Sequence, residues 1–139
     1  MNTWLFQGVP ERYDVSEKLV EGKLETWLVT RFREDIKPGD IVYFYRAGQK
    51  EKRGIYGWGV IQGEPVYFQD WGWGISVLYK KKFSPCLSAS ELASDPVLSQ
   101  HLIFRMPVGT NFRVSDEEAS ALDTLIRQKF SSAYSPREG

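Results

Sequence analysis

Residues 54–61 read Gly-Ile-Tyr-Gly-Trp-Gly-Val-Ile, a strand-like run with glycine at every second or third position. Within a strand, glycine marks a bend, a bulge or the close approach of another backbone. Such a strand is typical of a strongly curved sheet. The stretch therefore predicts a curled sheet or a small barrel at the centre of the fold.

Further strands are expected on both sides of this stretch. Pro38-Gly39 is a turn signal between two of them, because proline presets its own backbone angle while glycine accepts a positive φ. Apolar runs and alternating patterns predict the strands themselves. They cover Thr3–Phe6, Glu25–Arg33, Ile41–Tyr45 and Ile75–Phe83.

The last predicted element is a helix. Ser115-Asp116-Glu117-Glu118 has the pattern of a capping box, in which the serine and the second glutamate satisfy free backbone N–H groups. Apolar residues then recur at helical spacing as far as Phe130, so one face is expected to pack on the sheet. Residues 131–139 are predicted to be a flexible tail.

Two shorter helices are expected, one beginning at Asp14 or Ser16 and one at Ser88 or Ser90. The first would turn two apolar residues to the core, Leu19 and Val20. Residues 97–104 fit either a helix or a strand. Strands followed by helices indicate an α+β domain with a curved sheet, which we place at residues 1–130.

Composition limits the possible functions. At 139 residues the chain is long enough for one domain, and its 18 basic and 18 acidic residues give no global field that would hold a long nucleic acid. Any nucleic-acid contact is therefore expected to be local. The single cysteine, Cys86, predicts neither a disulfide nor a metal site. No leader or membrane span is recognisable, so we expect a cytoplasmic protein.

Catalytic groups are scarce in the sequence. His101 is the only histidine and lies next to Leu102, Ile103 and Phe104, which favours a packing role over a catalytic one. Cys86 is expected to be a small buried hydrophobe. The chain has no Walker loop, and the glycines of residues 54–59 are followed by strand residues rather than a helix. We therefore predict neither an enzyme nor a cofactor.

Aromatic residues gather at predicted turns and strand ends. The group comprises Trp27, residues 43–46, Trp58 and the segment Trp71-Gly72-Trp73-Gly74. Flat rings next to glycine in a loop favour stacking on a flat ligand, and one base stacked on one ring contributes roughly 1–3 kcal/mol. For Trp4 and Trp58 a core role is an equally good interpretation, whereas a pocket role is favoured for Trp71 and Trp73.

The order and spacing of these motifs resemble an EVE domain of the PUA-like superfamily over nearly the whole chain. The resemblance is carried by Trp4-Leu5-Phe6, Pro10, Tyr13, Trp27, Arg31-Phe32, Gly39-Asp40, residues 42–45, residues 54–59, and Pro107 to Phe112 before the capped helix. EVE domains are similar to YTH domains, which hold a methylated adenine in an aromatic cage, and EVE proteins are associated with modified bases, cytosines in particular. The resemblance implies a PUA-like α+β fold, a small curved sheet or β-barrel surrounded by helices, with a pocket open at one side.

The resemblance also implies the positions of an aromatic cage. Trp27 resembles the first cage wall of YTH domains, and Trp71 and Trp73 resemble their paired tryptophans. Polar residues are expected around these rings, and for each of them a salt bridge or a turn role is an equally good interpretation. The predicted ligand-binding residues are Phe6, Gln7, Trp27, Arg31, Tyr45, Arg46, Trp58, Trp71, Trp73 and Asn111, the last in a loop before the final helix.

The sequence thus favours a non-catalytic reader of a modified base, of the 5-methylcytosine type, in DNA or RNA. A separate effector protein is a further expected partner. One alternative is a small base-processing hydrolase that uses Asp40, Glu64 or Asp70 with His101. Another is a protein-interaction module that docks through exposed aromatics.

Overall fold

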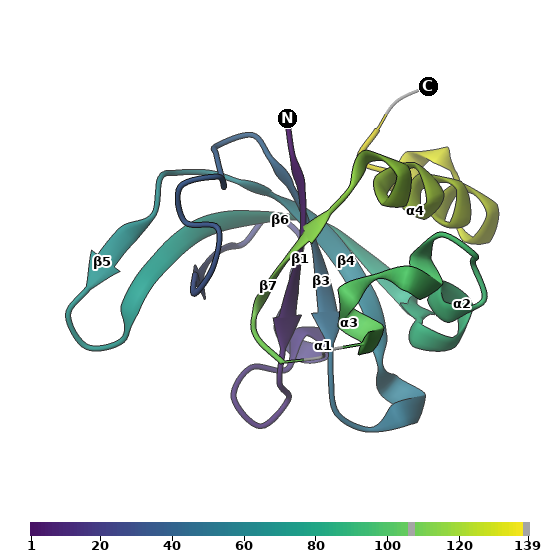
Figure 1. Cartoon of the computed structure of the whole chain (residues 1–139), viewed down its shortest axis with the longest axis horizontal. Coiled ribbons are helices and arrows are strands. Elements are labelled where there is room, and N and C mark those ends of the chain that lie inside the picture. The colour runs from purple at the N-terminus through teal and green to yellow at the C-terminus, as the bar shows by residue number, and fades with distance from the viewer. Residues whose placement is uncertain (106–107, 138–139) are drawn as a thin grey trace.

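The curled sheet predicted from residues 54–61 is the centre of the molecule (Figure 1). The structure is a computed structural model that describes residues 1–105 and 108–137. Pro107, which contributes to the family resemblance, lies outside the described residues, as does the end of the predicted tail. The strands are β1 (Thr3–Gly8), β2 (Leu24–Leu28), β3 (Ile41–Arg46), β4 (Gly54–Ile61), β5 (Val66–Phe68), β6 (Gly72–Ser88) and β7 (Asn111–Val114).

The strands form one mixed sheet in the order β2-β6-β4-β3-β1-β7, with β5 paired to β6. β1 and β3 are parallel, and the other pairs are antiparallel. A Cβ atom on Gly57 would lie 2.1 Å from the Lys81 carbonyl oxygen, so only glycine allows this approach of β4 to β6. The pairing of these strands also shifts register beside Gly57. The curvature predicted from the glycines is therefore confirmed.

Two hydrophobic clusters lie on opposite faces of the curled sheet. Alternation along β1 sends Trp4 and Phe6 to the cluster inside the curl and Leu5 to the cluster on the outer face. The inner cluster also contains Trp27, and all three of its aromatic members named here are at most 6% exposed. The outer cluster is shared with the helices that follow residue 88, which lie together at one side of the sheet in Figure 1.

The helices are α1 (Val15–Lys18), α2 (Ala89–Ala93), α3 (Leu102–Arg105) and α4 (Asp116–Lys129), with short 3₁₀ turns at Lys50–Lys52, Leu98–Gln100 and Ser132–Tyr134. Both capping boxes form, at Ser88 for α2 and at Ser115 for α4. Lys129 of α4 donates to Glu91 of α2 at 2.5 Å, which ties the two helices together. Within the described part of the chain, no helix has the length and apolar character needed to cross a bilayer.

Several predicted elements differ from the structure. α1 has only four residues, because Leu19 turns into the core and Val20 is 54% exposed instead of sharing its face. The predicted strand at residues 25–33 ends at Leu28. Cys86 is half-buried in β6 rather than buried. Asn111 lies in a strand, β7, and not in a loop.

The segment from Ser131 to Arg137 packs on the domain rather than extending as a flexible tail. Tyr134 stacks on Phe130 with ring centroids 5.2 Å apart, and its carbonyl accepts the Trp58 indole N–H at 2.8 Å. Arg137 donates to Thr3 at 2.6 Å. Aromatic and arginine side chains hold this segment against the domain. Its serine-rich sequence gives no sign of these contacts.

Candidate functional site

A cleft of about 690 Å³ lies between the β2–β3 connection and the hairpin formed by β5 and β6. Residues 28–35 line one side, and Trp71, Gly72 and Trp73 line the other. In Figure 1 this hairpin projects from the sheet on the side away from the helices. Arg31, Trp71 and Trp73 are therefore the predicted ligand-binding residues that the structure brings together.

The hairpin carries aromatic rings on both of its faces. Trp73 stands in β6, not in a turn as the sequence predicted, and pairs across the strands with Tyr67. Their ring centroids are 5.4 Å apart in an edge-to-face arrangement. Phe68 and Trp71 form a second, stacked pair at 4.6 Å. Trp73 is half-buried and Trp71 is 45% exposed, so both rings reach solvent.

Two exposed arginines accompany the rings of the cleft. The Arg33 guanidinium lies 4.2 Å from the centroid of the Trp73 ring, and that of Arg31 lies 4.9 Å from the centroid of Phe32. Among the described residues, neither arginine forms a salt bridge. A guanidinium stacks on aromatic faces and binds phosphate with a rigid fork of donors. The cleft thus combines flat surfaces with two arginines that form no salt bridge among the described residues, and its lining also includes the acidic residues Glu34 and Asp35.

Phe32 has an unusual backbone conformation at the edge of the cleft. Its φ of 61° lies in the left-handed region, which is uncommon for a bulky residue and is often found at functional sites. Its ring packs against Trp4 at 5.3 Å, and the Arg113 guanidinium lies 5.0 Å from its centroid. Arg113 in turn pairs with Asp35 at 3.1 Å. Sequence reasoning missed Arg33 and Asp35 here, although the alternation Arg31-Phe32-Arg33 was a usable signal.

Asn111 holds the cleft-lining segment to β7. It is fully buried, its side-chain oxygen accepts the Thr30 backbone N–H at 2.8 Å, and its amide nitrogen donates to the Leu28 carbonyl at 3.1 Å. These bonds satisfy backbone groups that leave the sheet where β2 ends. Asn111 therefore positions one wall of the cleft from within the protein.

The structure places Trp27 and Phe6 in the inner cluster, away from the cleft surface. Trp27 is 6% exposed, packs against Phe6, Tyr13 and Phe44, and donates its indole N–H to the Tyr79 hydroxyl at 2.9 Å. Strand alternation explains this, because Trp27 pairs with Ile75 of β6 and shares its inward face, where both belong to the inner cluster.

Tyr13 closes this polar network inside the curl. Its hydroxyl lies 2.6 Å from that of Tyr79 and donates to Glu25 at 2.9 Å. Burial raises the pKa of Tyr13 well above its ordinary value, and the contacts with Tyr79 and Glu25 raise it further. The phenol is therefore neutral: it donates its single O–H to Glu25 and accepts that of Tyr79, whose oxygen in turn accepts the Trp27 indole N–H.

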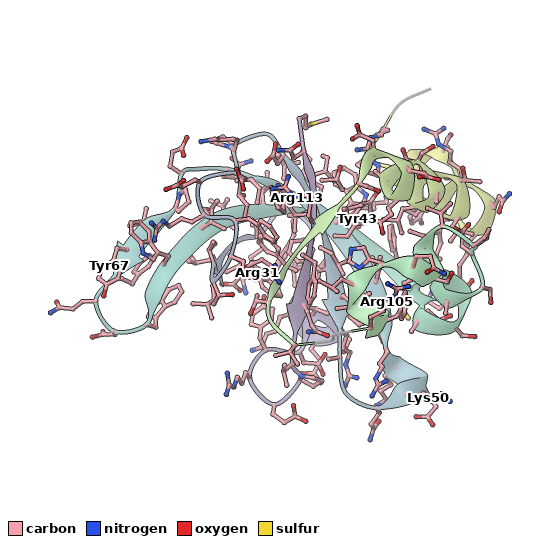
Figure 2. The ribbon with its side chains drawn as sticks, in the orientation of Figure 1. Arg31, Tyr43, Lys50, Tyr67, Arg105 and Arg113 are labelled. Carbon is pink, nitrogen blue, oxygen red and sulfur yellow. The ribbon has the colours of Figure 1, made fainter. Side chains whose placement is uncertain are left out.

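The remaining predicted residues lie apart from this cleft. Gln7 and Tyr45 line a separate pocket of about 460 Å³ that also contains Lys50 and Arg53. Gln7 donates to the Gly109 carbonyl at 2.9 Å. Figure 2 shows Lys50 in the half of the molecule opposite Tyr67.

Arg46 and Trp58 are engaged within the protein. Arg46 is 7% exposed and pairs with Asp14 at 3.1 Å. Trp58 is half-buried on the outer face of the sheet, where the segment from Ser131 to Arg137 covers it. Neither side chain lines the cleft.

The structure does not bring His101 beside Asp40, as a hydrolase would require. Asp40 accepts hydrogen bonds from Asn2, Trp4 and Lys37 at 2.9 to 3.0 Å. His101 is buried, accepts the Ile103 N–H at one ring nitrogen and donates from the other to the Arg113 carbonyl. The predicted packing role of His101 is confirmed. Among the described residues, no group of three metal-ligating side chains is present.

Sequence comparison identifies the family. The model of the EVE domain matches residues 2–125, which is most of the chain. The chain belongs to the EVE domain family. No curated protein matches its sequence. The curled mixed sheet with a few helices is a PUA-like α+β fold, so the predicted fold class is also confirmed.

Solved structures share the fold of this EVE domain at low sequence identity. The human THYN1 protein, in complex with DNA that contains 5-methylcytosine, is 18% identical with a TM-score of 0.72, and the match covers 100% of both chains. A hypothetical protein from Leishmania major is 18% identical with a TM-score of 0.73, covering 93% of this chain and 96% of that one. Protein PSPTO5229 from Pseudomonas syringae is 18% identical with a TM-score of 0.71, covering 88% and 98%.

Proposed function

We propose that this EVE domain is a non-catalytic reader of nucleic acid that holds one modified base, of the 5-methylcytosine type, in the cleft beside Trp73. The observation that carries the proposal is the pairing of the partly exposed Trp73 ring with the Arg33 guanidinium. The presence of DNA with 5-methylcytosine on the human THYN1 protein, which has the same fold, supports this ligand class.

In this proposal the base takes the place of the Arg33 guanidinium on the Trp73 ring. The guanidinium of Arg33 covers one face of Trp73 and, being exposed, can move to a neighbouring phosphate when a base stacks on the ring. Stacking contributes roughly 1–3 kcal/mol and depends little on base identity. Arg31, on the same side of the cleft, supplies a second phosphate contact.

Preference for a methylated base arises from apolar contact. Phe32 lines the cleft and is half-buried, so it offers apolar surface beside the stacked base. Burying one methyl group contributes about 0.8 kcal/mol, or roughly a fourfold preference. Larger discrimination would need hydrogen bonds to the base edge.

Trp27 supports this site from the core instead of forming its second wall. The Val29 N–H, two residues further on, donates to the Trp73 carbonyl at 2.9 Å, so the strand that Trp27 anchors also fixes Trp73. A reader that carries no catalytic group acts by occupying a base or by recruiting another protein, and a separate effector protein remains part of the proposal.

A second candidate function is a protein-interaction module. It is favoured by the exposed apolar side chains at the hairpin, namely Val66, Tyr67, Phe68 and Trp71, which are 36 to 59% exposed. Exposed aromatics serve both kinds of ligand, but the arginines of the cleft favour a polyanion.

The test is a tryptophan-fluorescence titration with short oligonucleotides that differ in a single base: cytosine, 5-methylcytosine, 5-hydroxymethylcytosine, adenine or N6-methyladenine. We expect quenching strongest with 5-methylcytosine, and a loss of affinity of roughly 5- to 150-fold in Trp73→Ala. Arg33→Ala should weaken binding, whereas Arg105→Ala, a matched change on α3, should not. Equal affinity of wild-type protein and Trp73→Ala would refute the proposed site, and no binding to any oligonucleotide would favour the interaction module.

A further inference from the structure

The two aromatic pairs of the hairpin lie on opposite faces of it. Strand alternation places Tyr67 and Trp73, which are cross-strand partners, on the face that turns toward the cleft and the inner cluster. The following residue, Gly74, presents the other face. A Cβ atom there would lie 2.5 Å from the Trp71 ring and 3.0 Å from the Phe68 ring, so the stacked pair covers Gly74 on the outer face.

The outer pair, Phe68 and Trp71, is held in a defined stacked geometry. The Phe68 and Trp71 rings are 4.6 Å apart and within 10° of parallel. The turn that joins them is closed by a hydrogen bond from the Trp71 N–H to the Phe68 carbonyl at 3.3 Å, and Gly72 takes a φ of 94° directly afterwards. Gly74 leaves room for the rings to lie against the strand, with Thr26 as their other neighbour.

Trp71 presents an open aromatic surface next to the cleft. It is 45% exposed although Phe68 stacks on it, and it also belongs to the lining of the cleft that contains Trp73. Two ring systems with separate open surfaces, one on each face of the same hairpin, suit two successive bases of one strand. A free nucleotide would use only the surface of Trp73.

We propose that Trp71, supported by Phe68, is a stacking platform for an unpaired base that flanks the recognised base, so that the ligand is a nucleic-acid strand rather than a free nucleotide. This inference rests on the proposed function, because the cleft of Trp73 defines which base is recognised. The platform adds affinity without discriminating between bases, since every base has a flat face. Arg31 and Arg33, on the cleft side, are placed to contact the backbone between the two bases.

The experiment compares 5-methyl-2′-deoxycytidine monophosphate with a single-stranded pentanucleotide that carries 5-methylcytosine at its centre. We expect Trp71→Ala to lower the affinity for the pentanucleotide roughly 5- to 150-fold and that for the monophosphate by a smaller factor, because the monophosphate has no flanking base. Trp71→Phe, which keeps a ring, should restore most of the loss. Gln69→Ala, at an exposed position in the turn of the same hairpin, is the control for a general disturbance of the hairpin.

A second readout locates the stacking directly. With 2-aminopurine beside the central 5-methylcytosine, its fluorescence should fall on binding to the wild-type protein but not to Trp71→Ala. An abasic site at that position should remove the effect of Trp71→Ala, because the two changes delete the same contact. Equal pentanucleotide affinity of Trp71→Ala and wild type overturns the platform alone, whereas failure of the wild-type protein to bind either ligand overturns the proposed function and the platform with it.

Discussion

Trp27 and Trp73 differ in role although both belong to adjacent paired strands. Trp27 is enclosed by Phe6, Tyr13 and Phe44 and donates to Tyr79, whereas Trp73 contacts Tyr67 and carries a guanidinium on its face. The first arrangement fills a core, and the second leaves an aromatic face that a ligand can take. Their positions predict opposite responses to truncation.

Trp27→Ala is expected to destabilise the protein by roughly 3–5 kcal/mol, because the change leaves a cavity in the inner cluster and removes the partner of the Tyr79 hydroxyl. Trp71→Ala, at an exposed ring, should cost less than about 1.5 kcal/mol. Urea unfolding followed by circular dichroism measures both. Similar small losses for the two variants would show that Trp27 is not a core residue.

Asn111→Ala is expected to cost about 1–3 kcal/mol and to weaken ligand binding, because it leaves the Thr30 N–H and the Leu28 carbonyl without their partner. The matched control is Asn2→Ala, since Asn2 is exposed and the hydrogen bond that ties it to Asp40 comes from its backbone N–H. That control should stay within about 0.5 kcal/mol of wild type. Unfolding free energies and oligonucleotide affinities check the prediction, which a stable, fully binding Asn111→Ala protein would refute.

Only some residues of the candidate site could be predicted from the sequence. The rings at Trp71 and Trp73 were recognisable from their glycine neighbours, and Arg31 from its place beside an aromatic. Strand alternation alone does not say which face of a sheet is inside, so the burial of Trp27 could not be predicted from the sequence alone. The positive φ of Phe32 is set by packing on Trp4 and has no local sequence signal.

At the scale of elements, the curvature of β4, the capping box at Ser115 and a serine cap at Ser88 or Ser90 could be predicted, because glycine and capping residues act locally. β5 and β7 were missed, since strands of three and four residues carry too little periodicity. β6 continues past Pro85 to Ser88 because its pairing with β4 skips from Lys82 to Leu87, which spares proline a ladder hydrogen bond.

The ion pair between Asp14, which caps α1, and Arg46, at the end of β3, makes a pH-dependent contribution to stability. Burial alone would raise the pKa of Asp14, but hydrogen bonds from Ser16 and Arg46 outweigh it, so this pKa lies below its usual value. A carboxyl with a lowered pKa stabilises the fold above the pKa of the unfolded chain, about 3.9, and the contribution is lost as pH falls through the folded value. Asp14→Asn is therefore expected to lower stability at pH 7 and to flatten its decline below about pH 4.

Unfolding at several pH values tests this prediction, and Glu91→Gln is a useful companion variant. Burial opposes the shift at Glu91 too, but Lys129 and Ser88 hold its pKa below the usual value, so it contributes with the same sign. Each variant should remove only the part of the fall in unfolding free energy at low pH that its own carboxyl group causes. An Asp14→Asn protein with the acid unfolding profile of wild type would contradict the role of the Asp14–Arg46 pair.

At the scale of the whole molecule, the curled sheet separates two surfaces. Helices α2, α3 and α4 cover the outer face, while the hairpin of β5 and β6 projects from the opposite side of the molecule (Figure 1) and contributes Trp71 and Trp73 to the cleft. The net charge is zero, and the cleft lining holds two arginines beside the acidic residues Glu34 and Asp35, so any attraction for phosphate is local to Arg31 and Arg33. Because so few charges contact the ligand, nucleic-acid binding is expected to depend only weakly on salt concentration.

For two phosphate contacts, from Arg31 and Arg33, the slope of log K against log salt concentration should be about −1.4 on single-stranded ligands. Arg33→Ala should reduce the magnitude of that slope by about 0.7, and Arg105→Ala should leave it unchanged. Titrations at several salt concentrations give these slopes. A wild-type slope steeper than about −3 would mean that binding is held mainly by the backbone charge and not by the cleft.

The most direct test of the central claim is an NMR titration that follows the five tryptophan indole N–H signals during addition of a short oligonucleotide with one 5-methylcytosine. The account predicts large shifts for Trp73 and Trp71 and small ones for Trp4, Trp27 and Trp58, whose N–H groups donate within the protein. Shifts confined to Trp27 or Trp58, with Trp73 unmoved, would contradict a base-binding site in this cleft.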